Sequence, residues 1–282
     1  MTTSPELLDR EVAAPPAPVP VRPSARLRRV AGKAIPPAVV LVVFVGGWEL
    51  ASRTGLLNEY IAPSPSEIAR VTWAMMKQPF FWSAVRITLY ETLAGYGLGC
   101  AGGFALGVLV ALYPMARRSI YPHAVAFQII PRSALAPLFL LWFGFGLTSK
   151  IVLAASIAFF PLVINTLTGI HAVDRDAQAM MRSLGASRWQ MFWRLTMPSA
   201  APLIAAALKL ALTLSLIGAV VGEFVGASEG LGVLLTQFQQ ALDTPRVYAV
   251  IICLAAMGLV LYGLIAWLER VVIFWTTTPA TR

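Results

Sequence analysis

Long apolar stretches alternate with short polar segments along most of this chain. A transmembrane helix needs roughly 20 apolar residues, or somewhat fewer when flanking side chains reach the interface. Six stretches meet this requirement, at approximately residues 35–52, 89–113, 121–143, 151–170, 202–225 and 247–269. The third is the least regular, because Pro131, Arg132 and Pro137 interrupt it. The pattern predicts an all-α, polytopic membrane protein with about six transmembrane helices.

Composition supports this class and excludes others. The chain is 58% hydrophobic and only 12% charged, which a soluble domain of this size cannot accommodate. The net charge of +9 does not indicate a nucleic-acid partner, because the basic residues are scattered over short loops. Cys100 and Cys253 lie inside apolar stretches and have no metal-site spacing, so both are expected to pack in the core.

The distribution of Lys and Arg predicts the orientation. If the N-terminus lies in the cytoplasm, most of the 22 basic residues fall in cytoplasmic segments, as the positive-inside rule requires. Both termini are therefore expected to be cytoplasmic. Residues 1–34, rich in Pro, Ala and Arg, are expected to form a disordered cytoplasmic tail, residues 35–275 the membrane domain, and residues 276–282 a short cytoplasmic C-terminal tail.

The most informative segment is a polar interruption between two apolar stretches, from Asp174 to Pro198. Its first half has an apolar helical face, and Gly185 is expected to end this helix, since glycine readily adopts positive φ. The face consists of Ala177, Met180, Met181 and Leu184.

The second half of this segment predicts another short helix. Ser187 and Gln190 have the spacing of a capping box, and Pro198 is expected to close the helix before Pro202 opens the next apolar stretch. Its apolar stripe consists of Trp189, Phe192 and Trp193. Two amphipathic helices joined at a glycine on one membrane surface indicate a docking surface for another protein.

Other features suggest packing and a translocation pathway. Gly95, Gly99, Gly103 and Gly107 recur every four residues, which permits close helix packing within one subunit or between two. Pro131 and Arg132 place irregular backbone and a charge near membrane depth, where a water-filled pathway or an interfacial position would accommodate them.

The remaining polar positions have simpler interpretations. Glu223 is a candidate for the outer mouth of a pathway, Lys209 for a cytoplasmic anchor, and Ser66 for the cap of a helix along the outer surface.

No constellation of catalytic or metal-binding residues is present in the sequence. Gly226–Gly230 matches G-x-S-x-G around Ser228, but it follows a membrane helix, and His123 and His171 are predicted toward the opposite face. The sequence also lacks a phosphate-binding loop. The chain is therefore predicted not to be an enzyme and to hold no cofactor or metal.

The interrupted segment resembles the permease of ABC-type importers, in the branch of nitrate, sulfonate and taurine permeases. That family has a loop that begins Glu-Ala-Ala, passes through a glycine and ends Ile-x-Leu-Pro. Here Gly185, Leu195, Met197 and Pro198 take the later places, and Ala179-Met180-Met181 replaces Glu-Ala-Ala. The resemblance extends to PSPSEI at 63–68, PRSALAPLFLLWFGFGLTSK at 131–150 and VGEFVGASEGLG at 221–232.

This resemblance implies a type I ABC importer permease of the bacterial inner membrane. It implies a homodimer bound to two cytoplasmic ATPases that hold ATP and Mg²⁺, and a periplasmic or lipid-anchored substrate-binding protein. The coupling residues it implies are Asp174, Asp176, Met180, Met181, Leu184, Gly185, Ala186, Ser187, Trp189, Phe192 and Pro198.

The resemblance leaves the solute open. A small anion such as a sulfonate, taurine, nitrate or an aromatic carboxylate is one interpretation, and a thiamine precursor or riboflavin is the alternative. A gradient-driven secondary transporter would favour internal repeats and acidic residues at the midplane, which the sequence does not show. An intramembrane hydrolase acting through Ser228 is the remaining rival.

Overall fold

A computed structural model describes residues 39–58 and 60–276, and these residues form helices and no strand. Residues 39–53 form a helix in a unit that ends at Leu56, and the helices named below belong to the second unit. The predicted N-terminal tail, the start of the first predicted span and residues 277–282 lie outside the described residues. The helices of the second unit are α2 (Pro65–Met76), α3 (Pro79–Leu112), α4 (Pro114–Ile129), α5 (Ala136–Phe143), α6 (Leu147–His171), α7 (Arg175–Ser183), α8 (Arg188–Met191), α9 (Met197–Gly226), α10 (Leu231–Gln240) and α11 (Thr244–Val272).

Four helices in the described residues are long and apolar enough to span a membrane. They are α3, α6, the continuous helix from Arg188 to Gly226, and α11. The prediction of a single span over 121–143 is wrong, because α4 ends at Ile129, a short 3₁₀ turn covers Arg132–Leu135, and α5 begins at Ala136. Pro131 interrupts the helix by lacking a backbone N–H and restricting the residue before it.

Two other helix starts differ from the predictions. The second span starts at Pro79, ten residues before the predicted position of 89, because Pro79 suits the first turn of a helix. The cap of α2 is Ser64, not Ser66, since Ser64 Oγ accepts a hydrogen bond from the Glu67 N–H at 3.3 Å. Ser66 lies inside the first turn.

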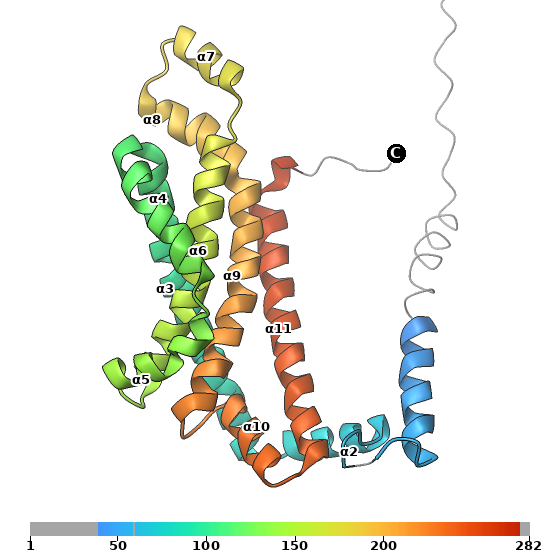
Figure 1. Cartoon of the computed structure of the whole chain (residues 1–282). Coiled ribbons are helices and arrows are strands. Elements are labelled where there is room, and N and C mark those ends of the chain that lie inside the picture. The colour runs from blue at the N-terminus through green and yellow to red at the C-terminus, as the bar shows by residue number, and fades with distance from the viewer. Residues whose placement is uncertain (1–38, 59, 277–282) are drawn as a thin grey trace, which may run out of the picture. The chain divides into compact units, whose positions relative to one another are not determined.

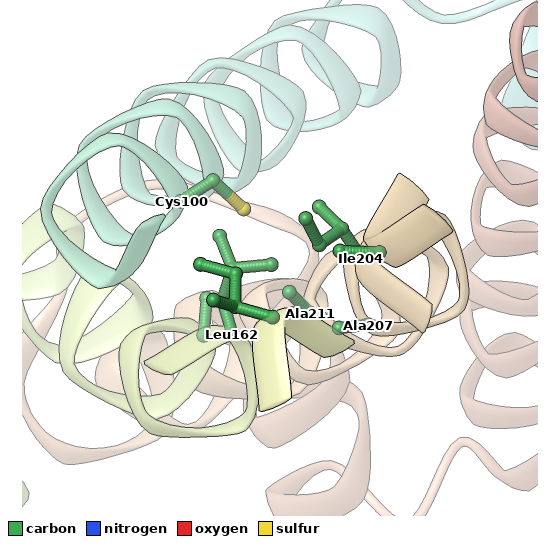
Figure 2. Packing of buried hydrophobic residues seen from close by; sticks show 8 residues of the cluster. Cys100, Leu162, Ile204, Ala207 and Ala211 are labelled. Carbon is green, nitrogen blue, oxygen red and sulfur yellow. The ribbon is translucent and has the colours of Figure 1, made fainter. Parts of the chain in front are cut away.

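The core of the second unit is the packing of α3, α6 and α9, with α11 alongside α9 (Figure 1). Figure 2 shows Cys100 of α3, Leu162 of α6 and Ile204 of α9 turned toward one another. Ala207 and Ala211 complete this apolar contact from α9, and both are fully buried. Small side chains at these positions let the three helices approach closely.

The glycine series on α3 lies directly against α6. A Cβ atom on Gly95 would lie 2.5 Å from Cβ of Ala154, and one on Gly99 would lie 2.5 Å from the carbonyl oxygen of Ala155. Gly103 and Gly107 meet the next two turns of α6 in the same way. The four-residue repeat therefore serves helix packing within one subunit, and its use in a dimer contact stays a prediction.

Candidate functional site

The helix α7 stands at one end of the bundle (Figure 1). Asp174 caps it, because its Oδ1 accepts a hydrogen bond from the Asp176 N–H at 3.0 Å. Met180 is 58% exposed and Leu184 75% exposed, and none of the residues of α7 is buried. Surface helices normally turn their apolar face inward, so this arrangement leaves an apolar surface for a partner to cover.

Gly185 ends α7 as the sequence predicts. Its φ of +76° is the left-handed conformation that favours glycine. Its N–H donates to the carbonyl of Arg182 and the N–H of Ala186 to that of Met181, both at 3.0 Å. These two bonds are those of a Schellman motif, which satisfies the last carbonyls of the helix and turns the chain sharply.

The predicted capping box at Ser187 is also present. Ser187 Oγ accepts from the Gln190 N–H at 3.2 Å, and Gln190 Oε1 accepts from the Ser187 N–H at 2.9 Å. This reciprocal pair starts α8 directly after the turn at Gly185. The two helix ends are thus joined through Gly185 and Ala186 alone, and the connection has little freedom.

The prediction that Pro198 closes a separate second helix is wrong. A π-helical segment, Phe192–Thr196, connects α8 to α9, so the helix runs without a break from Arg188 to Gly226. Pro198 has no N–H to donate, and the wider turn before it makes room for its ring. A force on α8 would therefore be transmitted directly into a membrane helix.

Three aromatic rings cluster on α8 and the π-helical segment. Trp189 stacks on Phe192 with ring centroids 6.3 Å apart and meets Trp193 edge-on at 5.4 Å. Trp189 is 69% exposed and Trp193 52% exposed. Trp189 of α8 and Trp193 of the π-helical segment are thus exposed apolar residues, as are Met180 and Leu184 in the first half of the segment.

A buried polar network lies at the opposite end of the bundle from α7. Lys150 Nζ of α6 lies 2.9 Å from Glu91 Oε1 of α3. Neither Glu91 nor Lys150 was among the predicted site residues. The position of Glu91 inside an apolar stretch could have indicated this site, because ionisable residues in such stretches usually have a specific partner.

Glu223 joins this network and is 2% exposed. Its Oε1 accepts from Thr88 Oγ1 at 2.6 Å and its Oε2 from the Gly232 N–H at 2.5 Å. Thr88 Oγ1 in turn accepts from the Leu231 N–H at 2.8 Å. Glu223 and Thr88 therefore bind the first turn of α10, whose backbone N–H groups have no partners within the helix.

The three candidate pathway residues have different positions: Glu223 is buried, Pro131 is exposed and the burial of Arg132 is not described. Glu223 is enclosed by α3 and α10, and Pro131 precedes the 3₁₀ turn that begins at Arg132. The Arg132 side chain lies outside the described residues. Lys209 pairs with Glu269 of α11, with Nζ 2.7 Å from Oε2. A role of Pro131, Arg132 and Glu223 in a pathway stays a prediction.

In the part of the chain that the structure describes, no group of His, Cys, Asp and Glu side chains could hold a metal ion. Ser228 and Glu229 of the G-x-S-x-G match line a cavity of about 290 Å³ near α10. The long apolar helices are typical of an integral membrane protein, and the exposed two-helix segment joined at Gly185 offers a surface for a partner.

Comparisons with known proteins agree with this class. Residues 103–273 match the family of the binding-protein-dependent transport system inner membrane component. The chain is 34% identical over 247 residues to the formylaminopyrimidine transport permease ThiX of Halalkalibacterium halodurans, covering 86% of this chain and 96% of that protein. It is also 34% identical to the riboflavin permease RibX of Chloroflexus aurantiacus, covering 88% and 93% of the two chains.

A third relative is named for a different substrate. The chain is 30% identical to the putative aliphatic sulfonates permease SsuC of Bacillus subtilis, with 85% of each chain covered. Among solved structures, the MetNI methionine ABC transporter in an inward-facing conformation shares the fold, with a TM-score of 0.59, 21% identity and coverage of 72% of this chain and 100% of that one.

The chain belongs to the family of binding-protein-dependent transport system inner membrane components. It is an ABC importer permease subunit with the type I importer fold, a multi-pass protein of the bacterial inner membrane and a transport component rather than an enzyme.

Proposed function

We propose that this permease forms the translocation pathway of an ATP-driven importer as a homodimer with two cytoplasmic ATPase subunits. ATP and Mg²⁺ are held by the ATPases, and a periplasmic or lipid-anchored binding protein delivers the solute. The observation that carries the proposal is the exposed apolar face of α7, with Met180 and Leu184 turned away from their own chain. Such a face is stabilised when a partner covers it.

The coupling follows from the helix connections. Closure of the ATPase pair moves α7, and the rigid turn at Gly185 passes the movement to α8. Because α8 continues through the π-helical segment into α9, the movement reaches the membrane bundle. Asp174, Asp176, Ala186 and Ser187 contribute by fixing the helix ends.

The transported solute is a small organic molecule. An anion is favoured if Arg132 faces the pathway, and the relatives named for aliphatic sulfonates support that class at 30–32% identity. Relatives named for formylaminopyrimidine and riboflavin, at 34% identity, support a nitrogen heterocycle. We propose the heterocycle as the first class to test.

Affinity purification in mild detergent tests the assembly. The wild-type chain should retain a stoichiometric soluble ATPase, identified by mass spectrometry. A Met180→Asp, Leu184→Asp variant should lose it, whereas Arg182→Gln on another face of α7 should retain it. A wild-type chain that purifies without an ATPase would instead favour a gradient-driven transporter.

Uptake experiments test the solute. Pyrimidines and flavins are compared with sulfonates and aromatic carboxylates as competitors of uptake. The group that reduces uptake identifies the class of the solute. If the solute is an anion, Arg132→Ala should reduce its uptake while ATPase association persists. Unchanged uptake of an anion would remove Arg132 from the pathway.

A further inference from the structure

A cavity of about 500 Å³ lies between α7 and the ends of the membrane helices. Arg175, Gln178 and Arg182 of α7 line one wall, and Arg188 of α8 lines another. Leu112 at the end of α3 and Ile170 at the end of α6 form the side next to the membrane helices. The cavity is thus lined by basic residues on one side and by apolar residues at the ends of α3 and α6 on another.

The positive charge in this cavity is uncompensated. No Asp or Glu is among its lining residues, and Arg175, Arg182 and Arg188 form no ion pair with any described residue. Arg175, Arg182 and Arg188 line the same cavity, and residues of like charge at one cavity favour the binding of an anion. Each presents planar N–H donors that suit phosphate oxygens.

The cavity and the exposed apolar face lie on opposite sides of α7. Arg175, Gln178 and Arg182 are separated by three and four residues, which places them on one face of the helix. Met180 and Leu184 project from the other face. A protein that covers the apolar face would therefore leave the basic wall accessible to a second ligand.

The size of the cavity and the number of arginines indicate the class of anion. One arginine can satisfy a carboxylate through two parallel hydrogen bonds, whereas a phosphate has enough oxygens for several. The apolar residues Leu112 and Ile170 beside the arginines suit a group attached to an acyl glycerol. A soluble phosphate compound would use the same basic wall without these apolar contacts.

We propose that this cavity binds a phosphate group, either that of an anionic phospholipid or that of a soluble phosphate compound. Occupancy would hold α7 against the ends of α3 and α6. Because this contact involves another face of α7, the proposal does not depend on which protein covers Met180 and Leu184.

The test uses the full-length chain, stripped of lipid in a neutral detergent. Three probes are titrated separately: short-chain phosphatidylglycerol, the matching diacylglycerol without phosphate, and inorganic phosphate. Binding is measured by native mass spectrometry and by the shift in thermal unfolding. The test variant is Arg182→Gln with Arg188→Gln, and the control is Arg194→Gln with Arg270→Gln, which removes equal charge outside the cavity.

Phosphatidylglycerol should bind the wild type and the control, and the test variant should bind it at least about tenfold more weakly. Binding of phosphatidylglycerol but not inorganic phosphate identifies the lipid source, and binding of inorganic phosphate identifies the soluble source. Equal binding to wild type, control and test variant overturns the proposal, as does equal binding of diacylglycerol. If the double variant does not fold, Arg182→Gln alone is compared with Arg194→Gln by the same criterion.

Discussion

Lys150 Nζ lies 2.9 Å from Glu91 Oε1, and the side chains are only 4% and 0% exposed. This ion pair connects α6 to α3 inside the bundle. Removing one member leaves the other charge buried without its partner, whereas removing both leaves neither charge of this pair. The contribution of each side chain to the stability of the bundle therefore depends on the presence of the other.

Lys150→Met should destabilise the protein by about 3–5 kcal/mol, and adding Glu91→Gln should recover much of that loss. Unfolding in detergent of both single variants and the double variant gives the coupling free energy. Arg70→Met is the control, because Arg70 and Glu67 form an exposed pair at 3.5 Å, which contributes only about 0–1 kcal/mol. Additive effects of Lys150→Met and Glu91→Gln would contradict the expected dependence.

Thr88→Val should loosen α10. The hydroxyl of Thr88 donates to Glu223 and accepts from Leu231, so its removal leaves buried groups unpaired at a cost of about 1–3 kcal/mol. Hydrogen exchange in Leu231–Gln240 should accelerate relative to α6. Thr92→Val is the control, since Thr92 Oγ1 bonds only a carbonyl of its own helix. Equal protection of α10 in both variants would show that Thr88 does not anchor it.

Gly99→Ala should destabilise the packing of α3 on α6 by about 1–3 kcal/mol, because the added Cβ would lie 2.5 Å from the Ala155 carbonyl oxygen. Gly97→Ala on the same helix meets nothing within 4 Å. That control should be neutral or stabilise the helix by about 0.5–1 kcal/mol. Thermal unfolding of both variants measures the two changes in stability, which should have opposite signs. A stabilised Gly99→Ala protein would show that α3 and α6 separate freely.

Gly185→Ala should weaken association with the proposed ATPase. Alanine at a φ of +76° is strained by about 1–2 kcal/mol, so the turn between α7 and α8 shifts. Gly55→Ala is the control, because Gly55 also has a φ of +76° and no atom within 4 Å of an added Cβ. The measurement is the amount of co-purified ATPase. Equal loss of co-purified ATPase from both variants would show that general backbone strain causes the effect.

Features that depend on neighbouring residues were predictable from the sequence. The end of α7 at Gly185 and the capping box of Ser187 and Gln190 follow from residue types a few positions apart. The apolar stretches of α6 and α11 likewise predict long membrane helices by length and composition. In each case the determining interaction is local, so its pattern is readable along the chain.

Contacts between residues far apart in the chain depend on the tertiary structure. Thr88 and Glu223 are 135 positions apart, and no periodicity indicates that both bind the first turn of α10. The continuation of α8 into α9 through a π-helical segment was equally unpredictable, because a proline favours a helix break until its surroundings supply a wider turn. Local sequence patterns thus predicted the helix end at Gly185, the capping box at Ser187 and the long apolar stretches. Packing determined the buried partners, since those contacts depend on how the helices approach in space.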